Sequence, residues 1–234
     1  TTLAKLPRRM VIVGDSQAHS LAVNKPSGIE KTFVITNGSI DGCGVYDRGV
    51  GIGGTSGKFR RNFANCKGFE TKWAKSAAQA KADVALVVVG AWEVMDLQIN
   101  SFLFKVNTVP ADTIFKTQLQ RGIDALRKQN VAVALLEVAC MRPVESKGGP
   151  VPPLPQRGDD TRTGHLNALM REVAAPENDG VYFVSGPKEW CTEPKVSTSL
   201  SYRWDGVHVY KPGAKLILET IAPALLQIPV THTK

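Results

Sequence analysis

The sequence predicts an α/β protein built as a three-layer α/β/α sandwich, with a five-stranded parallel sheet covered by helices on both faces. Short apolar runs of strand length alternate along the chain with longer segments of helical pattern. The run at residues 84–89 has no polar break, as expected of a strand buried on both faces. Right-handed crossovers between such strands place helices on either side of the sheet. Neither a linker nor an internal repeat divides the 234 residues, so we expect residues 1–234 to form a single domain.

Each expected strand is a short apolar run, and the first two end at turn signals. The first ends at Gly14 and the second at Asn37–Gly38. Among the expected helices, the third spaces Ile114, Leu119 and Ile123 along one face. The strands are expected at residues 10–13, 32–36, 84–89, 131–138 and 181–184, and the helices at residues 16–23, 72–82, 111–129, 162–174 and 213–226. The glycine-dense residues 38–68 and the proline-rich residues 141–160 predict long irregular loops.

Composition excludes several classes of protein. With 43% hydrophobic and 21% charged residues, the chain is typical of a folded globular protein. Its longest apolar runs are far shorter than the ~20 residues of a membrane span, so no transmembrane helix is expected. The net charge is +8, but the basic residues form only short pairs such as Arg8–Arg9 and Arg60–Arg61. We therefore expect no nucleic-acid partner, and a basic surface that faces an anionic envelope or sugar polymer.

The four cysteines, Cys43, Cys66, Cys140 and Cys191, are widely spaced. None forms a C-x-x-C motif and no histidine lies at zinc-finger distance, so a structural metal is not expected. Two disulfides in an oxidising compartment and four buried thiols are both compatible with this pattern, and we favour the disulfides. The simplest pairing is Cys43–Cys66 with Cys140–Cys191.

Two short motifs contain the residue types of nucleophilic catalysis. Ser16 directly follows the first expected strand and opens a helix, where free N–H groups stabilise a developing oxyanion. The same position also suits a simple N-cap serine. Histidine is the usual base for a serine nucleophile, and Asp205, three residues before His208, is placed to orient its ring. Either motif alone is weak.

Together the motifs are much stronger, because they converge on one edge of the predicted sheet. Ligands bind at the carboxyl ends of parallel strands. Ser16 and the Asp205–His208 motif are expected there, as are the segments N-G-S-I-D-G at residues 37–42 and G-A-W-E at residues 90–93. The sequence therefore predicts one site built from all four segments.

In order and spacing these four segments resemble the conserved blocks of the SGNH/GDSL serine esterases and acyltransferases. The blocks are G-D-S, a glycine after the second strand, G-x-N-D after the third, and D-x-x-H near the end. The resemblance implies a flavodoxin-like SGNH hydrolase fold and a site that needs no metal or cofactor. It implies Ser16 as nucleophile, His208 as base and Asp205 as its orienting acid, with the backbone N–H groups of Ser16 and Gly42 as oxyanion donors.

The third block departs from the family pattern. Trp92 replaces the asparagine that supplies a third oxyanion donor, and Glu93 replaces the aspartate. Losing such a donor costs about 10²–10³ in rate in serine hydrolases. Either another group supplies the donor, or the enzyme is slow, or the site binds without turnover. Trp92 is a candidate for stacking on a sugar, with core packing as its default role. Arg142 either meets an anionic substrate or caps the sheet edge.

The G-A-W-E variant, the glycines around Cys43 and the four cysteines resemble one subgroup, the SGNH domains fused to bacterial acyltransferase-three membrane proteins, which O-acylate envelope glycans. This implies an acyl donor, a glycan acceptor, and O-acylation, with acetyl the expected group, on the extracytoplasmic side. We expect residues 1–234 to be a domain excised from a longer chain that also carries a membrane acyltransferase domain. A secreted carbohydrate esterase or deacetylase and a catalytically weak glycan-binding module are the alternatives.

Overall fold

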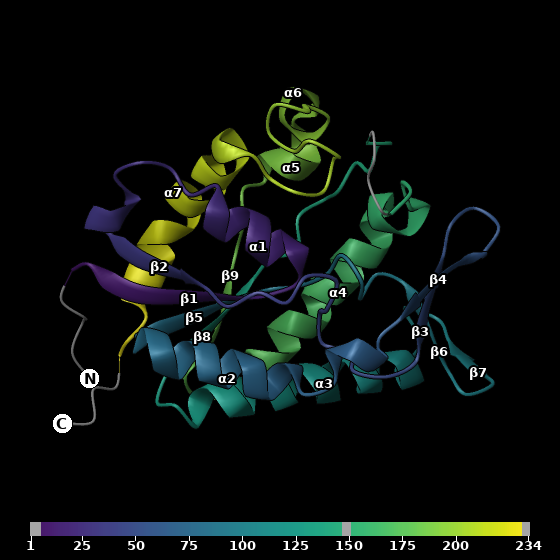
Figure 1. Cartoon of the computed structure of the whole chain (residues 1–234), viewed down its shortest axis with the longest axis horizontal. Coiled ribbons are helices and arrows are strands. Elements are labelled where there is room, and N and C mark those ends of the chain that lie inside the picture. The colour runs from purple at the N-terminus through teal and green to yellow at the C-terminus, as the bar shows by residue number, and fades with distance from the viewer. Residues whose placement is uncertain (1–5, 147–150, 231–234) are drawn as a thin grey trace.

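The computed structural model describes residues 6–146 and 151–230, and a five-stranded parallel sheet runs through its centre (Figure 1). The strands lie in the order β2–β1–β5–β8–β9, with every neighbouring pair parallel. This order is that of flavodoxin-like sheets, in which the order of the strands across the sheet reverses beside the first strand. The strands are β1 (Arg8–Gly14), β2 (Phe33–Asn37), β5 (Val84–Val88), β8 (Ala132–Leu136) and β9 (Val181–Val184). The prediction of fold class is confirmed.

Helices cover both faces of this sheet, because alternate residues of each strand point to opposite sides. On one face Met10 and Ile12 pack with α1 (Ser16–Val23) and α7 (Lys211–Gln227). On the other, Val11 and Val13 belong to the core formed with α2 (Phe69–Ala80), α3 (Val109–Arg127) and α4 (Asp160–Val173). Figure 1 shows α2 and α3 on the side of the sheet opposite α1 and α7. No helix in the described residues is long and apolar enough to cross a membrane.

The helices begin slightly away from their predicted positions where a buried face or a cap decides the boundary. Helix α2 begins at Phe69, three residues early, because Phe69, Trp73 and Ala77 form one buried stripe. Asp159 caps α4 by accepting hydrogen bonds from the N–H groups of Thr161 and Arg162. Short helical turns fill the connections: η1 (Ile29–Lys31), η2 (Ala64–Cys66), η3 (Pro155–Gly158), α5 (Glu189–Thr192) and α6 (Pro194–Ser197).

A second, antiparallel sheet was not predicted. Its four strands lie in the order β4–β3–β6–β7, away from the parallel sheet (Figure 1). They are β3 (Val50–Gly53), β4 (Phe59–Asn62), β6 (Asp96–Ile99) and β7 (Phe102–Phe104). The prediction of an irregular loop over residues 38–68 is therefore wrong for β3 and β4. Glycine-rich strands lack the apolar alternation that identifies a strand, and β3 is held by backbone pairing with β4 and β6.

Both disulfides of the simplest pairing are present. Cys43–Cys66 links the loop after β2 to η2, and Cys140–Cys191 links the segment after β8 to α5. Both bonds therefore hold segments that leave the carboxyl edge of the parallel sheet. Within the described residues no cysteine is free.

Removing either disulfide should lower the free energy of unfolding, because each crosslink reduces the entropy of the unfolded chain. The sequence separations are 51 residues for Cys140–Cys191 and 23 for Cys43–Cys66. We expect losses of about 4 kcal/mol for the Cys140→Ala/Cys191→Ala protein and about 3 kcal/mol for Cys43→Ala/Cys66→Ala, measured by urea unfolding. Thiol titration of the denatured, unreduced wild type is the control. Four reactive thiols would contradict the pairing.

Candidate active site

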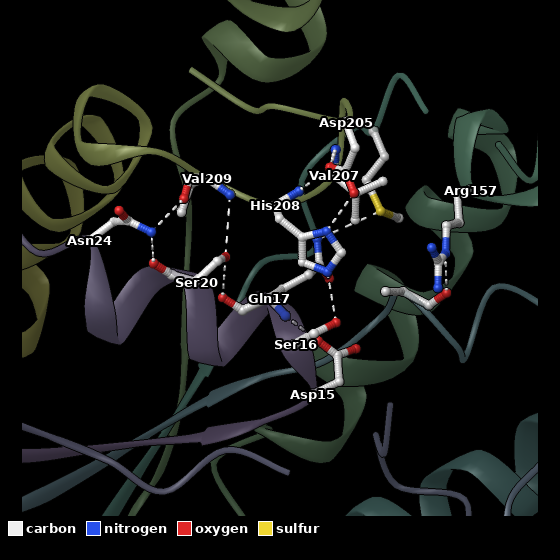
Figure 2. Close-up of polar contacts among 12 residues, drawn as sticks. Asp15, Ser16, Gln17, Ser20, Asn24, Arg157, Asp205, Val207, His208 and Val209 are labelled. Carbon is white, nitrogen blue, oxygen red and sulfur yellow. Dashed lines mark hydrogen bonds and ion pairs between the residues drawn. The ribbon is translucent and has the colours of Figure 1, made fainter. Parts of the chain in front are cut away.

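Ser16, His208 and Asp205 form a continuous hydrogen-bonded chain at the carboxyl edge of the sheet (Figure 2). Ser16 Oγ lies 2.7 Å from His208 Nε2, and His208 Nδ1 lies 2.6 Å from Asp205 Oδ2. Because a carboxylate only accepts hydrogen bonds, Nδ1 carries the ring proton, and Nε2 is free to accept the hydroxyl proton of Ser16. This is the geometry of a serine–histidine–aspartate triad.

The loop that carries Asp205 and His208 is fixed from several sides. Asp205 Oδ1 accepts the backbone N–H groups of Val207 and His208 at 2.9 and 2.8 Å. Gly206 has φ +76°, and a Cβ there would lie 1.7 Å from the carbonyl oxygen of Arg142. Only glycine allows this approach.

Helix α1 holds the end of the same loop. Asn24 Nδ2 donates to the carbonyl of Val209 at 3.0 Å, and Ser20 Oγ accepts its N–H at 3.2 Å (Figure 2). The ring of Trp204 stacks on the imidazole of His208, 5.3 Å between centroids and 15° from parallel. The helix that presents Ser16 therefore also positions the histidine.

The carboxyl groups near the serine have different environments. Partial burial of Asp205 opposes ionisation, but its hydrogen bonds with His208 outweigh burial and lower the pKa of Asp205. Asp15 is fully buried. Its Oδ1 caps α1 by accepting the N–H of Gln17 at 2.7 Å, while its Oδ2 has no partner in the described part of the chain. Burial, and after it the charge of Glu93, raises the pKa of Asp15 to about 7.

The turn that contains Gly42 lies against the start of α1. The N–H of Ile40 donates to the carbonyl of Gly14 at 2.8 Å, and His19 Nδ1 lies 2.9 Å from Asp41 Oδ1. Gly42 has φ +76°, and its carbonyl accepts a hydrogen bond from Arg61 at 3.0 Å. Neither its N–H nor that of Ser16 has an acceptor in residues 6–146 and 151–230. Both donors are thus free, as the prediction for an oxyanion hole requires.

The prediction that Trp92 stacks on a sugar is wrong, because its side chain is 3% exposed and belongs to the core. Phe59 stacks on the ring with 6.4 Å between centroids, and the guanidinium of Arg157 lies 4.4 Å from its centroid. The indole N–H of Trp92 is buried without a partner in the described residues. It is sealed off from any ligand and does not replace the missing amide.

Glu93 fastens the third block to the loop after β2. Its two carboxylate oxygens accept the N–H groups of Val45 and Gly90, both at 2.8 Å. The side chain has no exposed surface, and this burial raises its pKa against the effect of these hydrogen bonds. Glu93 therefore acts as an internal brace.

Arg142 is held by a carboxylate of the protein itself. Its two terminal nitrogens contact the two oxygens of Asp160 at 2.7 and 2.8 Å, and this pairing raises its pKa. Its backbone N–H donates to the carbonyl of Gly206 at 3.0 Å. Of the two predicted roles, capping of the sheet edge fits these contacts, and binding of an anionic substrate does not, because Asp160 already occupies the guanidinium.

Arg157 is a residue near the triad that the sequence did not reveal. It lies in η3, within the predicted loop at residues 141–160, of which residues 147–150 lie outside the described residues. Its side chain is only 4% exposed, and Nε donates to the carbonyl of Ala91 at 2.8 Å. A proline-rich segment gives no periodic signal for burial, so an arginine in it looks like a solvated surface residue.

Comparison with solved structures places the fold among known acylhydrolases. The periplasmic domain of a lipopolysaccharide acetyltransferase from Salmonella ser. Paratyphi A matches 96% of this chain and 86% of its own, with a TM-score of 0.58 and 12% identity. A GDSL-like lipase from Bacteroides thetaiotaomicron matches over 96% and 90%, with a TM-score of 0.56 and 12% identity. An acetyl xylan esterase matches over 93% and 99%, with a TM-score of 0.52 and 15% identity.

These likenesses show that the chain has the fold of the SGNH/GDSL acylhydrolases, so the predicted resemblance is confirmed for the fold. No protein-family model matches the sequence, and no curated protein matches it. The similarity to these proteins therefore lies in the fold and in the residues of the four short sequence blocks.

Asp15 should make the stability of the protein depend on pH. The folded state holds the carboxyl proton of Asp15 more tightly than the unfolded chain does, in which the pKa of this group is 3.8. Protonated Asp15 therefore stabilises the fold below about pH 4, and this stabilisation is lost as pH rises to about 7. In Asp15→Asn the amide oxygen keeps the cap on Gln17 without titrating. Between about pH 4 and pH 7 we expect the free energy of unfolding of the variant to rise by roughly 4 kcal/mol relative to that of wild type, measured by urea unfolding. Parallel pH curves for the two proteins would contradict the raised pKa.

Proposed function

We propose that this protein is a serine-dependent acyltransferase that O-acylates a cell-envelope glycan through an acyl-serine intermediate, with acetyl the expected group. The observation that carries the proposal is the hydrogen-bonded chain from Ser16 through His208 to Asp205. A serine hydroxyl is a weak nucleophile until a base takes its proton, and this chain supplies the base and orients it.

The proposed reaction has two half-reactions. Ser16 Oγ attacks the carbonyl carbon of the acyl donor while its proton passes to His208 Nε2. The oxyanion is held by the N–H groups of Ser16 and Gly42, and Asp205 stabilises the imidazolium. Collapse breaks the bond to the leaving group, which takes the proton from His208. A glycan hydroxyl then attacks the acyl-serine by the same steps in reverse and restores the free hydroxyl of Ser16.

Several features support a glycan acceptor outside the cytoplasm. A similar fold forms the periplasmic domain of a lipopolysaccharide acetyltransferase. Two disulfides are typical of oxidising compartments, and a net charge of +8 favours binding to anionic envelope polymers. In this proposal a membrane acyltransferase domain in the full-length chain delivers the acyl groups. Hydrolysis by a carbohydrate esterase shares the first half-reaction, and water replaces the glycan in the second.

Covalent labelling tests the first half-reaction. A fluorophosphonate probe should label Ser16 of the wild type, as located by peptide mapping, and should not label Ser16→Ala. We expect the rate constant for labelling to fall about 10⁶-fold in His208→Ala and about 10⁴-fold in Asp205→Ala, because the histidine takes the proton while the aspartate only orients the histidine. Equal losses in the two variants would contradict these roles.

A folded wild-type sample that the probe leaves unlabelled would contradict an activated serine. In that case glycan binding that is equal in wild type and Ser16→Ala would identify a binding module.

An acceptor assay tests the second half-reaction. The wild type is incubated with p-nitrophenyl acetate, with and without O-deacetylated envelope polysaccharide, and acetate release is compared with acetyl ester formed on the glycan. We expect ester formation that saturates with glycan and lowers the yield of free acetate. Acetate release that is unaffected by glycan would contradict transfer and identify an esterase. Ser16→Ala is the control for non-enzymatic acetylation.

A further inference from the structure

Arg157 is a nearly buried cation without a carboxylate partner. Its side chain is 4% exposed, yet no ion pair involves it in residues 6–146 and 151–230. Burial lowers its pKa, while the charges of Asp15, Asp205 and Glu93 act in the opposite direction. Arg203 is also buried without an ion pair in the described residues, but both of its terminal nitrogens donate hydrogen bonds to carbonyl groups. A buried cation without such pairing needs a reason.

The guanidinium of Arg157 lies on the third block. Its Nε donates to the carbonyl of Ala91, and its carbon atom Cζ lies 4.4 Å from the ring centroid of Trp92. Residue 92 is the position at which the family has its asparagine. The ring of Trp92 therefore packs against the guanidinium of Arg157, which reaches the third block from η3.

The remaining nitrogens of Arg157, Nη1 and Nη2, are available. Neither makes a hydrogen bond within the described part of the chain, and neither is sealed from solvent. Figure 2 shows Arg157 on the opposite side of Ser16 and His208 from Ser20 and Asn24. The charges of Asp15, next to the nucleophile in sequence, and of Asp205, which orients the base, both act on this cation.

We propose that the guanidinium of Arg157 is the third oxyanion donor of this site, in place of the side-chain amide that Trp92 displaces. The proposal rests on the acyl-serine chemistry proposed above. When Ser16 Oγ adds to the carbonyl carbon, the C=O electron pair moves to oxygen, and an Nη–H of Arg157 hydrogen-bonds the anion while keeping its own proton. A charged donor forms a stronger hydrogen bond to an oxyanion than a neutral amide does.

Matched variants test this role. Arg157→Met removes the donors and keeps an unbranched chain over Trp92, and Arg157→Lys keeps the charge. Arg162→Met is the control, because Arg162 also braces this segment, donating to the carbonyl of Val94 and to Asp96 at 2.9 and 2.8 Å. The measurements are kcat and KM for p-nitrophenyl acetate and for a negatively charged p-nitrophenyl ester, the rate of fluorophosphonate labelling of Ser16, and the unfolding temperature.

We expect Arg157→Met to lower kcat and the labelling rate by about 10²–10³ while KM changes less than threefold, because the contact strengthens in the transition state. Arg157→Lys should recover part of the loss, and added ethylguanidinium should partly restore Arg157→Met. Arg162→Met should keep wild-type rates. To separate rate from folding, rates are measured below the unfolding temperature of each variant.

Each other outcome is decisive. If Arg157→Met labels and turns over at the wild-type rate, the inference is wrong and the proposed function stands. If only KM rises, and only for esters that carry a negative charge, Arg157 binds an anionic substrate group and is not an oxyanion donor. If wild type neither labels nor turns over, the proposed function fails, and the inference fails with it. If Arg162→Met loses as much rate as Arg157→Met, the effect is structural.

Discussion

The parallel pairing of β1 with β5 is the constraint on which the site depends. It sets Gly14 opposite Val88, so that both strands end together and the segments that follow them meet. Ser16 leaves one strand and the Ala91–Trp92 segment leaves the other. Because the two strands are parallel, both end at the same edge of the sheet. The nucleophile and the third block are therefore brought together although they are far apart in the sequence. Helix α1 then connects this edge to the His208 loop through Ser20 and Asn24.

Charge around the serine is balanced in a way that follows from burial. Asp205 belongs to the triad, Asp15 precedes Ser16, and the charge of Glu93 acts on Asp15; burial favours the neutral form of Asp15 and Glu93. Asp205 is the exception, since its hydrogen bonds with His208 keep it ionised. The pKa of about 7 for Asp15 means that the field at the oxyanion becomes more negative as pH rises. A positive group in the same space offsets that change, and Arg157 is the cation that all three carboxyl groups influence.

The sequence predicted those parts of the fold that depend on local pattern. The five parallel strands and the helix faces follow from apolar periodicity, and the catalytic candidates follow from short motifs whose spacing matched one sheet edge. The antiparallel sheet was missed because its strands are only three or four residues long, and because Gly51 and Gly53 make β3 resemble a loop. Arg157 was missed because its burial arises from Ala91 and Trp92, which lie more than sixty residues away in the chain. Long-range packing of a polar residue leaves no periodic signal.

The changes in the third block make sense as one set. A tryptophan at 92 removes the amide donor but fills the space between Phe59 and Phe63, where its ring is closed off from solvent. A glutamate at 93 accepts N–H groups from Val45 and Gly90 and so joins the block to the Gly42 loop. The tryptophan also offers a π face, which stabilises a guanidinium that has no carboxylate to pair with. The loss of the asparagine and the presence of Arg157 therefore belong together. In the proposed site the third donor comes from η3, and Trp92 of the third block packs against its guanidinium.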